Sequence, residues 1–464
     1  MFILDNDDTV PLYKQLYRQI REQVLSGKLP AHGRLPSVRD LAAELSTSRN
    51  TVEGAYQELC AEGYIYSRQR SGYFVSALDH DAAPLPRAPE PRRQGPPPQP
   101  SPGCRYDFHP ARLDPAGFPV ALWRACFLES LRESSRELSQ YGDPQGDWAL
   151  RGNIRQYLER SRGVICEPDQ IVICAGLQQG LDGVAHLLKG SHSSAAVEDP
   201  GYHLPRAVFR NNLFDIVPVP VGPGGIDLDM LRAAGSTIAY VTPSHQLPTG
   251  CVMPIANRLK LIEWAESGDN LIIEDDYDSE LRYHGKPIPA LQGLRPDGNI
   301  IYMGTFSKVL SPALRLSYMV LPRPLLARFR GVYGDYFSTV PLLEQRTMAK
   351  FMEQGHWERH IRRMRILYQK KHDALLRSIE RHFGGKAAVT GQGAGLHVVL
   401  QLLGQNPGES EIIRRAERNG IRLFPFSATC AAGEPAQTNL LLGFGGMTTV
   451  EIEEGIELLA RLCF

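Results

Sequence analysis

The stretch Ile300-Ile301-Tyr302-Met303-Gly304-Thr305-Phe306-Ser307-Lys308 carries the most information about the fold. Its first four residues form a short apolar run, which predicts a strand buried on both faces of a mostly parallel sheet. The polar residues after Gly304 then lie at the carboxyl end of that strand, where ligands bind in such sheets. A lysine at this edge can form a Schiff base with an aldehyde if its amine is deprotonated.

Six further apolar runs resemble this strand and alternate with helical stretches. They are Ile171–Cys174, Ser194–Val197, Ile216–Val219, Ile238–Val241, Leu271–Ile273 and Tyr318–Leu321. Alternating strands and helices are typical of an α/β fold with helices on both faces of a parallel sheet. The sequence therefore predicts a mostly parallel seven-stranded sheet.

Several of these strands are followed by groups suited to a phosphorylated ring. Leu177 and Gln178 open a helix after a glycine, and amides at a helix start can hold a phosphate. Hydroxyls and a guanidinium for the same phosphate come from Thr305, Ser307 and Arg315. Each group alone is common on protein surfaces, so the prediction depends on their joint order at strand ends.

A second set of groups suits the ring itself. Asp275 and Tyr277 follow the strand Leu271–Ile273. A carboxylate there can pair with a protonated pyridine nitrogen, which makes the ring an electron sink. The phenol can hydrogen-bond the 3′ oxygen of the ring, and Tyr202 can stack on its face.

The first 78 residues follow a different pattern. Leu12, Leu16, Ile20 and Val24 form one apolar stripe on a first helix. Ser37 can cap a second helix that buries Leu41 and Leu45, and a third helix buries Val52, Ala55, Tyr56 and Leu59. Two short strand-like runs, 64–67 and 73–75, flank a tip at 68–72. The pattern predicts a helix-turn-helix followed by a β-hairpin wing.

A recognition helix presents its N-terminal residues to base edges in the major groove. Candidate contacts with double-stranded DNA are therefore Arg49, Asn50 and Thr51 on the third helix, Ser37 and Arg39 on the second, Arg34, and Arg70 and Gly72 in the wing. Charge does not settle the matter, because 51 Lys and Arg balance 51 Asp and Glu over the 464 residues. A small helical domain with ordinary surface charge is the alternative.

A proline-rich segment separates the two blocks. Residues 81–104 contain nine prolines, which excludes a regular helix or a central strand. The expected organisation is a DNA-binding domain at 1–78, a linker at 79–104 and an effector domain at 105–464. Within the last, we expect a large part at about 145–330 and a smaller α+β part at about 105–144 and 331–464. No apolar run is long enough to cross a membrane, and no cysteine or histidine spacing indicates a metal site.

The N-terminal motifs resemble the winged helix-turn-helix of GntR-type transcription regulators. The similarity covers Pro11–Tyr13, Gly33–Ala42, Ser48–Val52, Glu62–Tyr64 and Ser71–Val75 in order. It implies that Ser37, Arg39, Arg49 and Thr51 contact DNA, with assistance from the wing near Arg70 and Gly72.

From about Tyr106 onward the chain resembles fold-type-I pyridoxal-phosphate enzymes of the aminotransferase family. The resemblance implies that Lys308 is the Schiff-base lysine and that pyridoxal 5′-phosphate is the cofactor. Joined to the winged helix, this domain looks like the MocR/GabR subfamily of transcription regulators. The segments 242–250 and 274–280 are similar to the forms of these motifs in that subfamily.

Three positions depart from the enzyme pattern. The enzymes usually carry Asn before a Pro-Thr-Gly, and this chain has Leu247 at that place. Leu247, His245 and Gln246 are all possible neighbours of the ring, and we name His245 as a candidate contact. The usual Asp, three residues before the tyrosine, is Glu274 here, whereas Asp275 matches the subfamily. No arginine lies in the segment 440–444, so Arg206 and Arg422 are the candidates for binding an effector carboxylate.

We therefore expect a cytoplasmic, homodimeric regulator whose large domain senses an amine, an amino acid or a vitamin B6 compound. The alternative is a working aminotransferase with an attached DNA-binding module, and a third reading is a regulator whose large domain holds no cofactor. The family resemblance further implies a head-to-tail dimer. The effector and the operator cannot be identified from the sequence.

Overall fold

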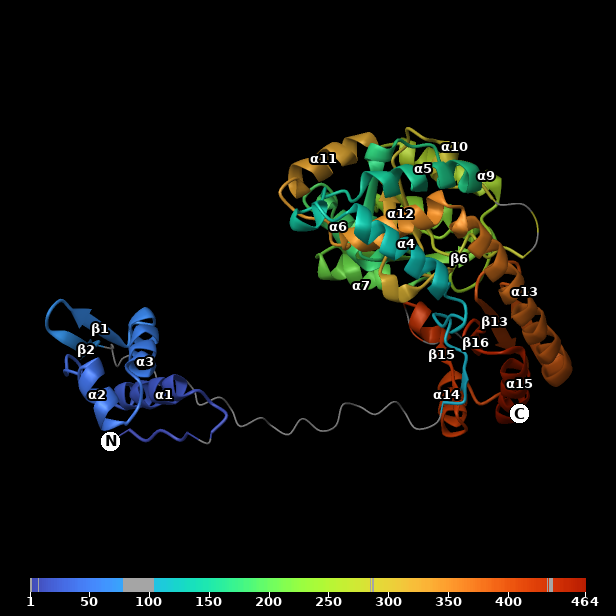
Figure 1. The fold of residues 1–464 in the computed structure, drawn as a ribbon. Coiled ribbons are helices and arrows are strands. Elements are labelled where there is room, and N and C mark those ends of the chain that lie inside the picture. The colour runs from blue at the N-terminus through green and yellow to red at the C-terminus, as the bar shows by residue number, and fades with distance from the viewer. Residues whose placement is uncertain are drawn as a thin grey trace. The chain divides into compact units, whose positions relative to one another are not determined.

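The computed structural model describes residues 2–6, 8–77, 104–283, 285, 288–431, 433 and 437–464. The chain divides into two compact units, residues 1–100 and 101–464 (Figure 1). The expected linker at 79–104 lies outside the described residues apart from Cys104. The domain boundaries therefore stay a prediction.

The N-terminal unit consists of three helices and a two-stranded hairpin, so the predicted winged helix-turn-helix is confirmed. Its elements are α1 (Leu12–Leu25), α2 (Val38–Glu44), α3 (Arg49–Ala61), β1 (Ile65–Arg68) and β2 (Gly72–Val75). The predicted stripe on α1 buries Leu16, Ile20 and Val24 against Val52 and Tyr56 of α3. Leu12 and Leu45 are only half-buried, because they lie at the ends of their helices.

Two serines fix where α2 and α3 begin. The amide of Asp40 donates to Ser37 Oγ at 3.1 Å, and the amide of Thr51 donates to Ser48 Oγ at 3.1 Å. Such a cap contributes about 1 kcal/mol to stability. Because Ser48 caps α3, Arg49 and Asn50 occupy its first two positions, where both side chains are exposed.

The larger unit is built on an eight-stranded sheet with the order β4-β11-β10-β9-β8-β5-β6-β7. All seven predicted strands are present: β4 (Ile171–Cys174), β5 (Ser194–Asp199), β6 (Asp215–Gly222), β8 (Ile238–Val241), β9 (Leu271–Asp276), β10 (Ile300–Thr305) and β11 (Ser317–Val320). The eighth strand, β7 (Gly225–Ile226), was not predicted, because two residues are too few to show alternation. Only β11 and β7 run antiparallel to their neighbours.

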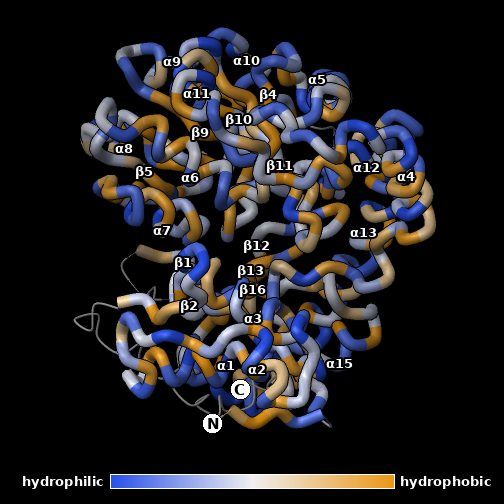
Figure 2. Tube along the Cα trace, turned by 60° about the vertical axis from the view of Figure 1, so that its left-hand side comes forward, coloured by the Kyte–Doolittle hydropathy of each residue, from blue (hydrophilic) through white to orange (hydrophobic). Residues whose placement is uncertain are grey.

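Helices cover both faces of this sheet. Alternate residues of β9 and β10 enter opposite cores; Ile273 and Met303 pack on one side, whereas Ile272 and Ile300 pack on the other. The first face is covered by α6 (Leu177–Leu188), α7 (His203–Asn211) and α11 (Arg323–Tyr333). The second is covered by α5 (Trp148–Arg162), α8 (Leu228–Ala233), α9 (Ile255–Glu266), α10 (Leu291–Leu294), α12 (Leu342–Glu353) and α13 (His356–Phe383). Figure 2 shows hydrophobic residues gathered along the strands between these helices.

A smaller α+β subdomain adjoins the sheet, as predicted. Its antiparallel sheet has the order β12-β13-β16-β15. Its strands are β12 (Ala387–Thr390), β13 (His397–Leu402), β15 (Phe424–Pro425) and β16 (Asn439–Gly443), with β3 (Tyr106–Asp107) paired to β14 (Ile421–Arg422). Helices α14 (Glu409–Arg418) and α15 (Thr449–Cys463) complete it, and α4 (Val120–Glu133) packs on α12. Within the described residues, no helix combines the length and the apolar character that crossing a bilayer requires.

Candidate functional site

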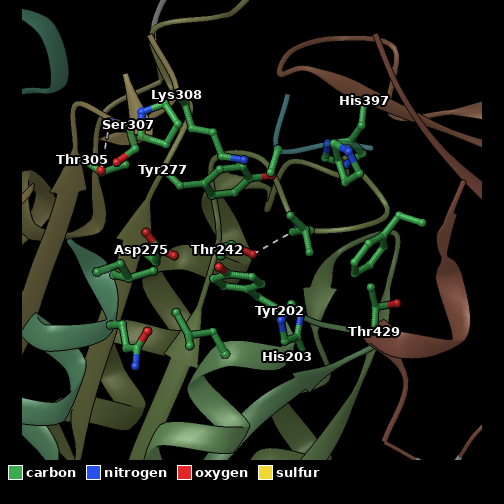
Figure 3. Close-up of a pocket in the computed structure, with 18 of the residues that line it drawn as sticks. Tyr202, His203, Thr242, Asp275, Tyr277, Thr305, Ser307, Lys308, His397 and Thr429 are labelled. Carbon is green, nitrogen blue, oxygen red and sulfur yellow. Dashed lines mark hydrogen bonds between the residues drawn. The ribbon is translucent and has the colours of Figure 1, made fainter. Parts of the chain in front are cut away.

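A cavity of about 460 Å³ lies at the carboxyl ends of the sheet strands. Nine of the ten predicted cofactor residues line it: Leu177, Gln178, Tyr202, Asp275, Tyr277, Thr305, Ser307, Lys308 and Arg315. Figure 3 shows Lys308, Tyr277, Asp275 and Tyr202 around one space, with Thr305 and Ser307 on one side and His397 and Thr429 on the other. The structure thus brings together residues that lie far apart in the sequence.

Lys308 follows β10 and reaches over Tyr277, with Nζ 5.9 Å from the centre of the ring. Burial lowers the pKa of the Lys308 amine, while the negative charges of Asp278 and Asp275 act in the opposite direction. A lowered pKa increases the fraction of free amine, which is the form that attacks a carbonyl.

Asp275 enters the cavity because it lies on the opposite face of β9 from its two neighbours. Glu274 accepts the amides of Leu291 and Gln292 at 2.8 and 3.1 Å and does not line the cavity. Asp275 accepts a short hydrogen bond from the Tyr240 hydroxyl. Burial raises the pKa of Asp275 to about 7, although Tyr240 and Lys308 favour its ionised form. Of the two carboxyls, Asp275 is therefore the one able to meet a ring nitrogen.

Asp276, the third carboxylate of β9, does not line the cavity but holds neighbouring segments in place. Asp276 receives two hydrogen bonds from Arg162, at 2.6 and 3.1 Å, and one from the Tyr302 hydroxyl at 2.6 Å. Arg162 also donates to Ser244 Oγ at 2.7 Å. This network ties α5 to β9 and to the loop after β8.

The end of the cavity beside the start of α6 is suited to a phosphate. Gly176 has a φ of +85° and precedes α6, whose first amides have no acceptor within the helix. A Cβ on Gly176 would lie 2.1 Å from a guanidinium nitrogen of Arg315, so the glycine makes room for that side chain. Arg315 donates to the Ala175 carbonyl at 3.3 Å, which holds it beside the start of α6.

His245 is the predicted cofactor residue that does not line the cavity. It is 3% exposed and lies behind Tyr277, whose hydroxyl is 3.1 Å from His245 Nδ1. Leu247 lines the cavity instead. The side-chain amide of Gln246 donates to Glu198 and to the Pro200 carbonyl, which turns it away.

Neither candidate for carboxylate binding lines the cavity. Arg206 donates to the Ala428 carbonyl at 2.9 Å. Arg422 is exposed and lies 3.7 Å from Asp107. Within the described residues, both arginines therefore contact other groups.

Sequence reasoning missed several residues that line the cavity, among them His109, His203, Thr242, His397, Phe424 and Thr429. They come from segments on both sides of the sheet and from the smaller subdomain. His397, for example, contacts the Pro248 carbonyl across 149 positions. Thr242 begins the motif-like segment 242–250 and could have been found there, and His109 and His203 could have been considered as isolated histidines near strand ends, whereas no local motif marks the others.

In the N-terminal unit, the predicted DNA contacts are accessible. Arg34, Ser37, Arg39, Arg49, Asn50 and Arg70 are exposed, whereas Thr51 and Gly72 are half-buried. The guanidinium of Arg34 lies beside Gly72, within 3.8 Å of where a Cβ would stand. None of these four arginines forms an ion pair within the part of the chain that the structure describes. Their charges remain available to an anionic partner.

Comparison with known families matches each unit separately. Residues 12–75 match the family described as bacterial regulatory proteins, gntR family, and residues 114–459 match aminotransferase class I and II.

Three relatives align along nearly the whole chain. The chain is 40% identical to the uncharacterized HTH-type transcriptional regulator YdeL of Bacillus subtilis, covering 97% of this chain and 96% of that protein. It is 35% identical to the probable rhizopine catabolism regulatory protein MocR of Rhizobium meliloti, covering 98% and 94%. It is 33% identical to the HTH-type pyridoxine biosynthesis transcriptional regulator PdxR of Corynebacterium glutamicum, covering 93% and 91%.

Among solved structures, the larger unit is similar to LysN, an α-aminoadipate aminotransferase from Thermus thermophilus. That structure contains N-(5′-phosphopyridoxyl)-L-leucine. The TM-score is 0.69 at 27% identity, over 77% of this chain and 91% of LysN. The similarity extends to the enzyme fold, while the N-terminal unit matches a regulator family.

Proposed function

The chain belongs to the MocR/GabR subfamily of GntR-type transcriptional regulators, and on that premise we propose that it binds operator DNA and pyridoxal 5′-phosphate. The observation that carries the cofactor proposal is the convergence of Lys308, Asp275 and Arg315 on one cavity. We assign the protein to the cytoplasm, because DNA binding requires access to the chromosome, and to a homodimeric state, because helix-turn-helix dimers bind two half-sites.

The residues of the cavity fit the cofactor from end to end. Arg315, Thr305, Ser307 and the first amides of α6 would hold the phosphate. Asp275 would meet the ring nitrogen, and Tyr277 would donate to the 3′ oxygen. Tyr202 would pack on the ring face, and Lys308 would bind the aldehyde.

When bound, the cofactor supplies an aldehyde that a primary amine can capture. Residues of the chain favour the reaction of the Lys308 amine with this aldehyde. Burial keeps the Lys308 amine reactive, while the Asp278–His245 pair holds the hydroxyl of Tyr277 in place. If an effector amine took the place of the Lys308 amine at the cofactor, Lys308 would be released into the cavity and the side chains around it would repack. Such a change could be passed on without steady turnover.

The N-terminal unit would read DNA with the exposed start of α3. Arg49 and Asn50 would contact base edges, while Thr51, Ser37 and Arg39 would contact bases or phosphates. Arg34 and Arg70, beside Gly72, would follow the backbone next to the wing. Sequence-independent phosphate contacts make such binding sensitive to salt.

Absorbance tests the cofactor proposal directly. The purified protein loaded with pyridoxal phosphate should absorb at about 420 nm, and Lys308→Ala should lose this band. Lys370→Ala, at an exposed position on α13, is the matched control and should keep it. A band that persists in Lys308→Ala would contradict the assignment, and steady turnover of an amino donor and a keto acid at ordinary enzyme rates would contradict the regulatory role.

A further inference from the structure

The cavity extends beyond the residues that would hold the cofactor. The remaining wall includes His109, His203, Leu247, His397, Phe424, Thr429 and Leu441. The total volume of about 460 Å³ lies in the usual range for sites that take drug-sized ligands. An effector that reacts with the aldehyde of the cofactor would lie against this wall.

This wall carries no positive side chain that could neutralise a carboxylate. Among the described residues that line the cavity, the Lys and Arg side chains are Lys308 and Arg315. Lys308 would bind the aldehyde, and Arg315 lies at the other end beside Gly176. A carboxylate buried without a cation or several donors is strongly disfavoured.

The imidazoles of the wall are neutral. His397 donates through Nε2 to the Pro248 carbonyl at 3.1 Å, and burial lowers the pKa of His397 to about 3. Its Nδ1 is therefore left as an acceptor. Burial also lowers the pKa of His109 and of His203, and the positive charges of Arg422 and Arg112 on His109 and of Arg206 on His203 act in the same direction, so the neutral form of each imidazole is favoured. His109 Nδ1 accepts the amide of Ala111 at 3.1 Å, which leaves Nε2–H as a donor.

Hydrogen-bond directions around the cavity also favour a cationic amine over an anion. The Thr429 hydroxyl donates to the Phe426 carbonyl at 2.6 Å, and the Thr242 hydroxyl donates to Glu198 at 2.6 Å. The hydrogen of each hydroxyl is thus engaged, so each oxygen can act only as an acceptor, and the Thr242 oxygen already accepts the Leu247 amide at 3.3 Å. The negative charges of Asp278 and Asp275 oppose the lowering of the Lys308 pKa, so they also disfavour an anion in this part of the cavity.

The outer part of the wall is aromatic. The ring of Phe424 lies edge-on to His109, with centres 5.1 Å apart, and 6.2 Å from His203. Leu247 and Leu441 extend this surface. Such a surface gains free energy by covering apolar or aromatic groups.

From this wall, and resting on the proposed function, we propose that the effector is a primary amine whose remaining part is uncharged and apolar or aromatic. Amino acids, whether the carboxylate is on the α-carbon or at the far end, should be weaker effectors, because the cations that line the cavity in the described residues, Lys308 and Arg315, are both engaged by the cofactor. Of the three effector classes that the sequence leaves open, an amine, an amino acid and a vitamin B6 compound, the proposal favours the amine. Binding of such an effector does not require Arg206 or Arg422.

The test uses the full-length protein loaded with pyridoxal phosphate and follows the absorbance of the loaded cofactor at about 420 nm. The probes are matched pairs, 2-phenylethylamine against phenylalanine and n-butylamine against 4-aminobutyrate. Each amine should change the spectrum at a concentration at least about tenfold lower than its carboxylate partner. Equal or stronger responses to the amino acids would overturn the inference, and so would a loaded protein that no amine affects.

A failure of the proposed function would look different, because the protein would then show no such band before any amine is added. Two variants sharpen the result. His203→Arg places a cation at the exposed rim, so it should reduce the preference for the amine in each pair. Arg422→Gln, which removes a cation outside the cavity, should leave the preference unchanged. A selective loss of the amino-acid response in Arg422→Gln or Arg206→Gln would also overturn the inference.

Discussion

His245 Nδ1 lies 2.8 Å from Asp278 Oδ2 in a region where both side chains are almost completely buried. The hydroxyl of Tyr277 lies 3.1 Å from the same nitrogen, so the three side chains form one cluster behind the cavity. His245 Nε2 has no hydrogen-bond partner among the described residues. The cluster therefore connects a residue that lines the cavity to a carboxylate that acts on Lys308 from a distance.

We expect Asp278→Asn to lower the pKa of Lys308. The negative charge of Asp278 stabilises the ammonium form and raises this pKa, so its removal leaves the effect of burial less opposed. The cofactor-free protein should then capture pyridoxal phosphate with a pH profile whose midpoint is lower by about one unit. Stopped-flow absorbance measures the profile, and Asp229→Asn, at an exposed ion pair, is the control. An unchanged midpoint would show that Asp278 does not act on Lys308.

We expect Arg162→Met to destabilise the larger unit by about 3–5 kcal/mol. The substitution leaves the carboxylate of Asp276 buried without its cation, and Tyr302 alone cannot replace two hydrogen bonds. All four tryptophans lie after residue 104, so tryptophan fluorescence in urea reports on this unit. Arg155→Met, which breaks an exposed pair with Glu159, should cost less than about 1 kcal/mol. Similar losses in both variants would contradict the importance of burial.

Glu280 should make the larger unit less stable as the pH rises. Burial raises the pKa of Glu280 to about 7, whereas a glutamate in the unfolded chain titrates near its usual value of about 4.3. Between these pH values the folded state holds a proton that the unfolded state has lost, so the free energy of unfolding falls as pH rises through the window.

Glu280→Gln should remove this contribution while keeping an acceptor for the Tyr157 hydroxyl, which lies 2.9 Å from the carboxyl. The loss of stability between pH 5 and pH 8 should then shrink by up to about 3 kcal/mol. Urea unfolding at both pH values measures it, and the exposed Glu453→Gln should behave as the parent protein does. The same pH dependence in the parent protein and in Glu280→Gln would refute the assignment.

Arg49→Ala should weaken binding to an operator selected from random DNA by the protein itself. Arg49 is the first residue of α3 and is exposed, so removing its contact with a base should cost about 1–3 kcal/mol and relax the preference at one position. Fluorescence anisotropy at several salt concentrations separates this from a phosphate contact, whose removal would mainly reduce the salt dependence.

Arg68→Ala is the control for Arg49→Ala. The guanidinium of Arg68 lies over the rings of Tyr66 and Phe74, at 5.4 and 5.1 Å from their centres, so its removal should reduce affinity less than the removal of Arg49. An Arg49→Ala protein with unchanged affinity and preference would mean that the recognition surface lies elsewhere.

Periodicity and strand-end position predicted most of the fold and much of the site. The seven strands of the large sheet are short apolar runs, and parallel topology places their carboxyl ends at one edge. Strand-end position alone was therefore enough to predict that Lys308, Asp275 and Tyr202 lie close together, and all three line the cavity.

What the sequence could not predict depends on packing between distant segments. His245 and Leu247 are two residues apart in one loop, and only the fold decides that Leu247 lines the cavity while His245 turns to Asp278. The sequence likewise does not show that Arg206 donates to the Ala428 carbonyl or that Arg422 lies beside Asp107, because both are contacts between distant segments.

Gly176→Ala should weaken binding of the cofactor's phosphate specifically. A Cβ there would lie 2.1 Å from a guanidinium nitrogen of Arg315 and 2.5 Å from its central carbon, and the φ of +85° disfavours any side chain. Arg315 must therefore move away from the start of α6, which removes a charge-assisted contact worth about 1.5–3 kcal/mol. Affinity for pyridoxal phosphate should fall about tenfold or more, while affinity for pyridoxal, which has no phosphate, should change little. Gly152→Ala, on α5 with open space around the added methyl group, is the matched control and should alter neither affinity. Equal losses for the two vitamers in Gly176→Ala would mean that the glycine serves the fold of the β4–α6 turn and not the position of Arg315.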